Sequence, residues 1–526
     1  MIKTNIKLEL NYSYDSVKDA ICAALPIKRE EIIDCHLVKR TLNLNDKGGI
    51  HYDATVAISL SPEREYGLLK MRKRVSEYPS YELNIPQSKL NTRPIVVGFG
   101  PAGLFAALIL AECGAAPIVF ERGLPVDERD ERVKLFSTLG ILDTECNVQF
   151  GEGGAGTYSD GKLKVGAMDK YKMKVLKTLV ECGAPEDVLF SSTAHVGTDR
   201  LSGIVKKIRE RIIYLGGEIH FSSRLTDISV KDGAVCGITV KNKENEEKYD
   251  TDALVLATGH SARDMFILLS EKGVALEARG FGIGVRLEHP REYINELVYG
   301  KGYPDLLESA SYHLVTHLKG GRSVYSFCMC PGGTVVPAAS CHGGIVTNGM
   351  SEFARDGENS NAAFLVSVTP SDFSSDSPLA GIELQKKIEE KAYSLTDSYK
   401  APCQRLGDFL NDTLTGTLPT KPTYPIGTEI HRTENYLPEF ITDSLRKSIN
   451  DFDDWMRGFY YPDAVMTGPE TRTTSPVRVL RGESLDSLNI KGLYPAGEGA
   501  GYAGGIISSA RDGVIIAERI LMKNRC

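Results

Sequence analysis

The chain has 526 residues, of which 42% are hydrophobic and 25% charged, and its net charge at pH 7 is −7. This composition is that of a globular protein with several domains, and it provides no global electrostatic field for nucleic acid or an anionic membrane. The 11 cysteines include no CxxC pair, so we expect no metal site. We see no apolar run long enough to span a membrane, so we expect no membrane partner. The N-terminus does not resemble a signal peptide, so we expect a cytoplasmic location.

Residues 1–90 form the first predicted unit. The hydrophobic pattern predicts a strand at 6–12, an amphipathic helix opened by Asp15 or Ser16, two further strands and a second helix starting near Pro62. The order β-α-β-β-α indicates a small ferredoxin-like α+β accessory module. Because its basic and acidic residues nearly balance, we expect a packing or interaction role and no nucleic-acid partner.

A nucleotide-binding pattern follows this module. The strand Pro94–Val97 runs into the loop Gly98-Phe-Gly100-Pro-Ala-Gly103 and then into an apolar helical pattern. In such a unit the three glycines permit a tight turn, close approach of a pyrophosphate and close packing of helix on strand. The helix N-terminus adds free N–H groups and a partial positive charge. A second strand ends at Glu121, where a carboxylate can accept ribose hydroxyls and would repel a 2′-phosphate, so the pattern predicts FAD or NAD(H).

Two later stretches favour FAD. ALVLATG at 253–259 and LYPAGEGAGYAGG at 493–505 each read as a strand entering a glycine loop. Both resemble stretches of flavoproteins in which a late acidic residue, here Glu498, contacts the ribityl-phosphate region. A helical pattern then starts at Ile506, and its positive N-terminus would stabilise charge on reduced flavin.

A second complete strand–GxGxxG–helix unit is missing between residues 160 and 490. NAD(P)H would therefore have to dock transiently over the flavin as a reductant, or else the substrate itself reduces the flavin.

The remaining segments complete the predicted architecture. Residues 280–370 hold many short extended runs, and residues 381–460 look largely helical. We therefore expect an α/β fold in which an FAD-binding, Rossmann-like, three-layer domain carries an inserted domain. The predicted units are the ferredoxin-like module at 1–90, the FAD-binding domain at 91–279 and 461–526, and a mixed α+β substrate or cap domain at 280–460.

Four side chains are candidates for chemistry beside the flavin: Lys162, Arg472, Cys330 and His260. Lys162 ends the stretch 151–162, whose glycines leave N–H groups free for phosphate or flavin oxygen; the alternative is a flexible surface loop. Arg472 lies near Glu470 and Arg478, a cluster that would bind a carboxylate or hold the C-terminal region together by salt bridges.

The other two candidates also have structural alternatives. Cys328 and Cys330 would share one face of a strand, either for redox work or substrate contact or simply for packing. His260 would serve as a proton donor or as an ordinary structural histidine.

The predicted FAD contacts are Gly98, Gly100, Pro101, Ala102, Gly103, Glu121, Arg122, Gly153, Gly154, Ala155, Gly156, Thr157, Asp160, Ala257, Thr258, Gly259, Gly497, Glu498, Gly504, Gly505 and Ile506.

Several longer stretches resemble one family. They are GEGGAGTYSDGKL at 151–163, FGIGVRLEHPR at 281–291, YSFCMCPGG at 325–333, IVTNGMS at 345–351 and GPETRTTSPVRV at 468–479. They are similar to FAD-dependent dehydrogenase-like proteins, often labelled NAD(FAD)-utilizing dehydrogenases, of the glutathione-reductase-like flavoprotein superfamily.

The resemblance covers nearly the whole chain and implies an oxidoreductase that transfers hydride or electrons through flavin N5. Its partner would be a small-molecule substrate, for which a carboxylate-bearing compound is our expectation. The alternative is a flavin-containing binding or RNA-associated protein without robust turnover.

Overall fold

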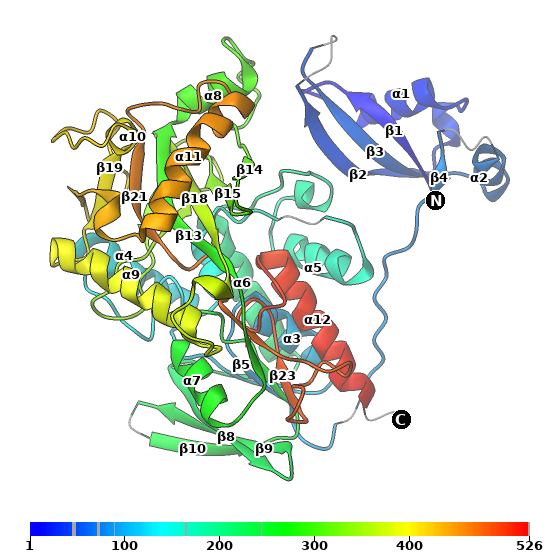
Figure 1. The fold of residues 1–526 in the computed structure, drawn as a ribbon. Helices are drawn as coiled ribbons and strands as arrows, with labels where there is room; N and C mark the ends of the chain where they lie inside the picture. The colour runs from blue at the N-terminus through cyan, green and yellow to red at the C-terminus, as the bar shows by residue number, and fades with distance from the viewer. Residues whose placement is uncertain (45–48, 71–73, 89, 164–165, 244, 524–526) are drawn as a thin grey trace.

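The computed structural model describes residues 1–44, 49–70, 74–88, 90–163, 166–243 and 245–523. The N-terminal module is a four-stranded antiparallel sheet in the order β2-β3-β1-β4 with two helices (Figure 1). This is the predicted ferredoxin-like arrangement. Alternate residues of β1 are buried against Val17 and Ile21 of α1. The elements are β1 (Ile2–Leu8), α1 (Tyr14–Ala24), β2 (Asp34–Asn43), β3 (His51–Ser59), α2 (Pro62–Leu69) and β4 (Ser76–Glu77).

A five-stranded parallel sheet in the order β23-β11-β5-β6-β7 forms the centre of the next domain. Chain order reverses between β5 and β11, and in open α/β sheets the crevice at such a point is where ligands bind. The α/β fold class with a Rossmann-like domain is thus confirmed. The strands are β5 (Ile95–Val97), β6 (Ile118–Phe120), β7 (Glu218–His220), β11 (Leu254–Leu256) and β23 (Leu493–Pro495).

Different layers cover the two faces of this sheet. Helices pack on one face, and a three-stranded antiparallel sheet with one helix packs on the other. The helical layer contains α3 (Pro101–Glu112), α5 (Lys170–Glu181), α6 (Thr198–Tyr214) and α12 (Ile506–Lys523). The opposite layer contains β8 (Ser223–Lys231), β9 (Ala234–Asn242), β10 (Asn245–Asp250) and α7 (Arg263–Glu271).

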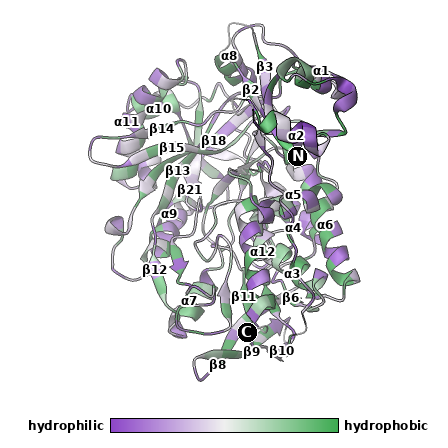
Figure 2. Ribbon diagram, turned by 90° about the vertical axis from the view of Figure 1, so that its right-hand side faces the viewer, coloured by the Kyte–Doolittle hydropathy of each residue, from purple (hydrophilic) through white to green (hydrophobic). Residues whose placement is uncertain are grey.

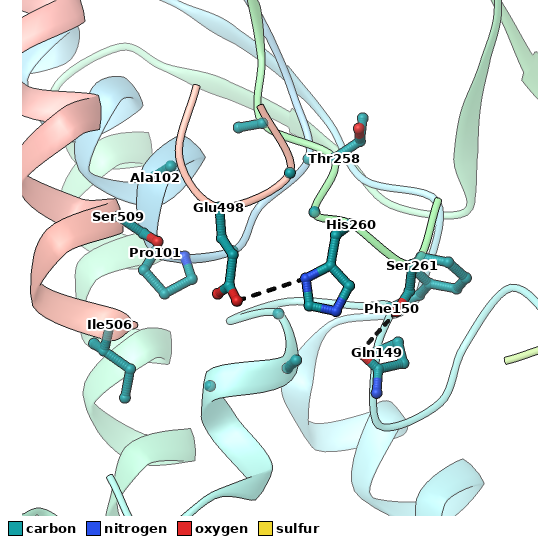
Figure 3. Close-up of a pocket in the computed structure, with 18 of the residues that line it drawn as sticks. Pro101, Ala102, Gln149, Phe150, Thr258, His260, Ser261, Glu498, Ile506 and Ser509 are labelled. Atoms are coloured by element: carbon teal, nitrogen blue, oxygen red, sulfur yellow. Dashed lines mark hydrogen bonds and ion pairs between the residues drawn. The ribbon is translucent and has the colours of Figure 1, made fainter. Parts of the chain in front are cut away.

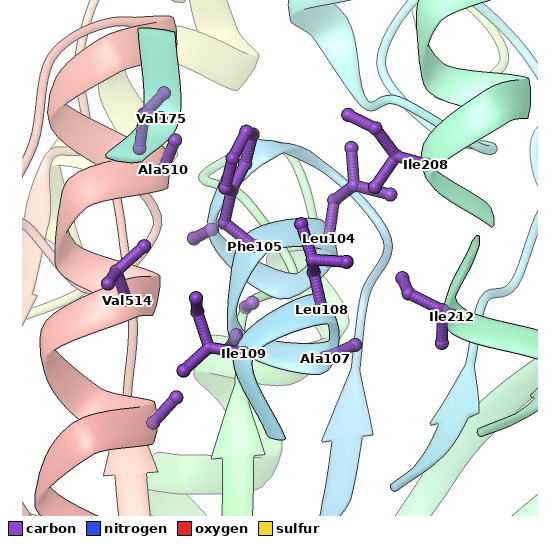
Figure 4. Close-up of a cluster of buried hydrophobic side chains, with 14 of the residues drawn as sticks. Leu104, Phe105, Ala107, Leu108, Ile109, Val175, Ile208, Ile212, Ala510 and Val514 are labelled. Atoms are coloured by element: carbon purple, nitrogen blue, oxygen red, sulfur yellow. The ribbon is translucent and has the colours of Figure 1, made fainter. Parts of the chain in front are cut away.

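Helix α3 is apolar on every side, as expected of a helix surrounded by protein. Figure 4 shows it between α12, with Val514, and α6, with Ile208 and Ile212. A Cβ at Gly513 would lie 2.1 Å from the carbonyl oxygen of Ala102, so this glycine allows α12 to approach α3. The close packing fixes the N-termini of both helices at one edge of the sheet.

The third unit is a seven-stranded mixed sheet in the order β14-β15-β18-β13-β21-β19-β20. Helices α9 and α11 complete its core. The elements are β13 (Phe281–Pro290), α8 (Arg291–Tyr299), β14 (Val315–His317), β15 (Ser323–Cys330), β18 (Asn359–Val368), α9 (Ala380–Thr396), β19 (Ala401–Arg405), α10 (Leu406–Leu410), β20 (Thr428–Ile430), α11 (Glu439–Trp455) and β21 (Val465–Glu470).

Two details differ from the sequence analysis. Strands β19 and β20 lie in the region 381–460 that we expected to be largely helical; β19 is buried along almost its whole length, so its sequence lacks the alternation that marks a half-exposed strand. Strand β21 also belongs to this sheet, so a domain boundary at residue 460 would divide the sheet.

Outer helices carry one apolar face, as α6 illustrates with its buried Leu201, Ile204 and Ile208 and the hydrophilic residues between them (Figure 2). Along the described residues, every helix is too short or too polar to cross a bilayer.

Candidate functional site

A cavity of about 310 Å³ lies at the carboxyl ends of the parallel strands. Four chain segments, at 97–102, 149–162, 257–261 and 496–509, supply most of its wall, and residues from β6, β8, α7 and the inserted domain complete it. Figure 3 shows the N-terminal turns of α3 and α12 side by side at its edge, marked by Pro101 and Ile506. The crevice that the strand order predicts therefore exists.

The protein's own packing does not require glycine at two positions of this wall. A Cβ at Gly504 or Gly505 would meet no atom within 4 Å, and both residues line the cavity. A side chain there would reach into the open space, so the bare main chain is what a closely approaching ligand requires.

Helix α3 begins after Gly100, which provides no side-chain cap. A Cβ on Gly100 would lie 3.5 Å from Cα of Gly154, so two glycine loops meet here. The first N–H groups of a helix lack intrahelical partners, and together with the helix dipole they favour a phosphate. This end of the cavity fits the diphosphate of FAD.

Glu121 organises these loops from within. Its buried carboxylate accepts hydrogen bonds from the main-chain N–H groups of Phe99 (2.8 Å), Gly123 (3.0 Å) and Gly151 (2.9 Å). A carboxylate has about four acceptor sites, so one remains for the predicted ribose contact. Positioning of the loops is a role that the sequence analysis missed.

His260 and Glu498 face each other across the cavity wall (Figure 3), with His260 Nδ1 3.6 Å from Glu498 Oε1. The buried Nε2 atom of His260 has no hydrogen-bond partner among the described residues. An orphaned polar atom in a cavity wall indicates a missing polar ligand. The cavity thus fits a nucleotide cofactor in shape and in hydrogen-bonding capacity.

Ionisable groups gather at another part of the wall, where Lys162, Cys328 and Glu470 line the cavity. The Lys162 ammonium donates to the carbonyl of Met329, and burial lowers its pKa. Burial raises the pKa of Glu470 to about 7, while its buried bidentate ion pair with Arg286 opposes the rise. These groups can hold charge or a proton beside a reacting molecule.

Two predicted chemical groups need correction. The Glu470–Arg472–Arg478 cluster does not form, because Arg472 pairs with Glu389 (3.0 Å) and Glu470 pairs with Arg286. Cys330 is fully buried and is absent from the cavity wall, whereas Cys328 lines it. Lys162, Arg472 and His260 do line the cavity.

Most of the predicted cofactor residues come together in the wall. These are Gly98, Gly100, Pro101, Ala102, Glu121, Arg122, Gly154, Ala155, Gly156, Asp160, Ala257, Thr258, Gly259, Glu498, Gly504, Gly505 and Ile506.

The other four, Gly103, Gly153, Thr157 and Gly497, lie behind the wall and shape it. A Cβ at Gly103 would lie 1.9 Å from the carbonyl oxygen of Gly98, which is the close helix packing that the motif predicts. Asp512 accepts a hydrogen bond from the N–H of Gly497 (2.7 Å).

The sequence analysis missed several wall residues, among them Gln149, Phe150, Ser261, Asn348 and Thr473. Phe150 directly precedes the glycine stretch and could have been included with it. Asn348 and Thr473 lie within the stretches 345–351 and 468–479 that resemble the family, but only tertiary packing brings these stretches to the cofactor cavity.

The fold and cavity define a Rossmann-like FAD-binding flavoprotein, and comparison with known proteins agrees. Residues 280–473 match the family described as FAD-dependent protein, C-terminal domain-like. Over 526 residues the chain is 44% identical to an uncharacterized protein of Clostridium beijerinckii (strain ATCC 51743 / NCIMB 8052), and the match covers 99% of this chain and 98% of that protein. The chain belongs to this FAD-dependent protein family, and its cofactor is FAD.

Two of the solved structures to which the chain is similar are distant in sequence. The 3-ketosteroid-Δ4-(5α)-dehydrogenase of Rhodococcus jostii RHA1 is 13% identical, with a TM-score of 0.36 over 84% of this chain and 99% of that one. The E. coli quinol fumarate reductase subunit FrdA is 13% identical, with a TM-score of 0.37 over 83% and 70% of the two chains.

Proposed function

We propose that this protein is an FAD-dependent, dehydrogenase-like oxidoreductase that exchanges a hydride or an electron pair with a small anionic substrate. One observation carries the proposal: the cavity that fits the nucleotide continues to a wall with Lys162, Cys328 and Glu470. Bound FAD supplies a ring that accepts or donates hydride at N5.

The protein's own groups bind, orient and manage charge. The N-termini of α3 and α12 attract the diphosphate and the flavin ring. Lys162 offers a positive charge to an anionic substrate, and Glu470, with its pKa raised to about 7 by burial, is able to hold a proton near neutral pH. NAD(P)H is the proposed transient reductant where the substrate itself is not the electron donor.

Anaerobic flavin bleaching tests the activity. Purified holoprotein is mixed with NADH, with NADPH and with a panel of carboxylates, amines and unsaturated acids, and flavin absorbance is followed. We expect stoichiometric FAD and bleaching by at least one donor, or reoxidation of the reduced flavin by an unsaturated acid. Stoichiometric FAD that responds to none of these compounds would favour a flavin-containing binding protein instead.

A glycine substitution tests the cofactor site. Gly504→Val adds a side chain to a residue that lines the cavity, at a position where a Cβ meets no protein atom within 4 Å, so we expect FAD affinity to fall roughly tenfold or more, equivalent to about 1.4 kcal/mol. The matched control is Gly203→Val on the exposed side of α6, where a Cβ also meets nothing within 4 Å. Equal FAD content in the two variants would contradict the placement of the cofactor.

A further inference from the structure

Two cysteines of strand β15 are in direct contact. The pairing of β15 with β18 shifts register between Phe327 and Cys330, and Cys328 at this bulge has φ of +40°. A non-glycine residue rarely adopts that region, and such strain persists only where the surrounding structure enforces it. A bulge re-aims side chains, and here the thiol of Cys330 donates to the main-chain carbonyl oxygen of Cys328 (3.3 Å), so the two residues are in direct contact.

The surrounding charges distinguish the two thiols. The hydrogen bond from Cys330, together with the charges of Arg286 and Lys162, lowers the pKa of Cys328 to about 6. The same hydrogen bond and burial raise the pKa of Cys330. Arg286 Nη1 lies 2.8 Å from the carbonyl oxygen of Cys328 and 4.0 Å from Sγ of Cys330. One sulfur is thus a thiolate nucleophile and the other a protonated partner, the division that thiol–disulfide exchange requires.

A second cavity of about 210 Å³ leads to Cys328. It shares Lys162, Phe327 and Cys328 with the FAD cavity. Its rim is exposed at Ser192, Thr193, Ser311 and His313, whereas Met329 and Arg355 in its wall are buried. Small molecules can therefore reach Cys328 from solvent without displacing the cofactor.

We propose that Cys328 and Cys330 form a reversible dithiol–disulfide couple that exchanges an electron pair with the FAD, and with small thiols or disulfides that enter through the second cavity. The electron exchange rests on the proposed function of the flavin site. With bound FAD as the oxidant, one S–S bond would form between the Cys328 thiolate and the Cys330 thiol, and two electrons and one proton would leave the sulfurs. FAD would accept the two electrons, and the proton from Cys330 together with one from solvent would balance its fully reduced form.

Exchange with an external disulfide balances in the same way. The Cys328 thiolate attacks one sulfur, the external S–S bond breaks, and one external thiol leaves. Cys330 then attacks the mixed disulfide, which releases the second thiol and closes the Cys328–Cys330 bond. In sum, the protein dithiol is oxidised and the external disulfide is reduced to two thiols.

Reductive titration tests the couple. Holoprotein is oxidised with diamide, desalted and titrated anaerobically with dithionite while flavin absorbance is followed. The wild type should consume two electron pairs for each FAD, one for the flavin and one for the disulfide, whereas Cys328→Ser and Cys330→Ser should each consume one. Cys236→Ser, which removes an exposed thiol of β9, is the matched control and should still consume two.

Disulfide mapping by mass spectrometry provides a readout that does not depend on the flavin. After diamide treatment, the peptide that carries both cysteines should lose two hydrogen atoms and regain them with dithiothreitol. Bound FAD with one electron pair per flavin and no mapped disulfide would overturn the couple but leave the flavin function intact. Protein without FAD would instead overturn the proposed function.

Discussion

At the scale of single residues, the reactivity of Cys328 depends on charges that face it from strand β13 and from the loop that carries Lys162. Its pKa is lowered to about 6, first by the Cys330 hydrogen bond and then by Arg286 and Lys162. A lowered pKa means that the thiolate is present above pH 6 and lost as the pH falls through 6, whereas an ordinary thiol with a pKa of about 8.5 is only a few per cent thiolate at pH 7.

We therefore expect the rate at which iodoacetamide alkylates Cys328 to rise with a midpoint near pH 6 in FAD-loaded protein, as followed by peptide mass spectrometry. Free glutathione, measured in parallel, gives the unperturbed profile. In Cys330→Ala the thiolate loses this hydrogen-bond donor, so the midpoint should move upward. A midpoint that coincides with that of glutathione would show that the cationic surroundings do not act on this thiol.

The two cysteines also mark how far sequence reasoning reaches for a single side chain. Their spacing predicted a shared strand face, and nothing local told which one would line the cofactor cavity. The register shift in β15 decides it, and that shift depends on pairing with β18, a strand about thirty residues away. Gly98, Gly100 and Glu121 were predictable because the strand, loop and helix that place them are consecutive in the chain.

At the scale of elements, Glu389 of α9 joins the inserted domain to the nucleotide domain. Its carboxylate contacts Arg472 (3.0 Å), which follows β21, and Arg263 (2.8 Å) at the start of α7. Burial alone would raise the pKa of Glu389, but the two guanidinium groups lower it to about 2. A carboxyl with a lowered folded-state pKa stabilises the fold above its unfolded pKa of about 4.3, and that contribution is lost as the pH falls toward 2.

Glu389→Gln should accordingly lower the free energy of unfolding by about 3 kcal/mol or more at pH 7, because it leaves buried arginines without their counter-charge. Between pH 7 and pH 3 the wild type should lose roughly 2 kcal/mol relative to the variant. Urea unfolding of the holoprotein at both pH values measures this convergence. The matched control is the neighbouring Glu390→Gln. The Glu390 side chain is 54% exposed and lies near Lys386, so this substitution should change the free energy of unfolding by less than about 0.5 kcal/mol. If the free energy of unfolding depended on pH in the same way in the wild type and in Glu389→Gln, the ion pairs of Glu389 would not contribute as proposed.

Elements were predictable where they carry their own pattern and not where burial removes it. The strand–glycine–helix units at β5 and β23 stand out because apolar strands are followed at once by glycine loops. Strand β19 could not be recognised in the sequence because it is buried along almost its whole length and so lacks alternation. The sequence of β21 looks like part of a polar loop, although this strand pairs within the seven-stranded sheet. Glu470 ends β21 and Arg472 lies just beyond it, and tertiary packing gives them different partners, Arg286 for Glu470 and Glu389 for Arg472.

At the scale of the whole molecule, the N-terminal module docks through the edge of its sheet. Strand β2 is one of the two outer strands. At this edge the main-chain N–H of Arg40 donates to the carbonyl of Phe190 (2.7 Å), and the carbonyl of Arg40 accepts from the N–H of Ser192 (2.9 Å). The Arg40 guanidinium lies over the rings of Tyr52 and Phe190 and 3.7 Å from Asp187. Docking thus covers an edge that would otherwise be open to pairing with other chains, and it holds the segment that forms the rim of the second cavity.

Arg40→Ala should loosen this module without unfolding it, because the side chain contributes cation–π and ion-pair contacts to docking but takes no part in the module's own core. A loss of about 1–2 kcal/mol would raise the population of the undocked form roughly fivefold to thirtyfold, and limited chymotrypsin cleavage at Tyr81 in the connecting segment measures that population. FAD content should stay unchanged, because the cofactor cavity lies in other segments. Arg29→Ala, which removes a guanidinium that is 45% exposed from the same module, should leave the cleavage rate as in the wild type.

Ser192 and Thr193 belong to both the docking segment and the rim of the second cavity. The Arg40 variant should therefore also change the alkylation rate of Cys328. Equal rates of cleavage and of alkylation in the wild type and both variants would mean that contacts other than Arg40 hold the module in place.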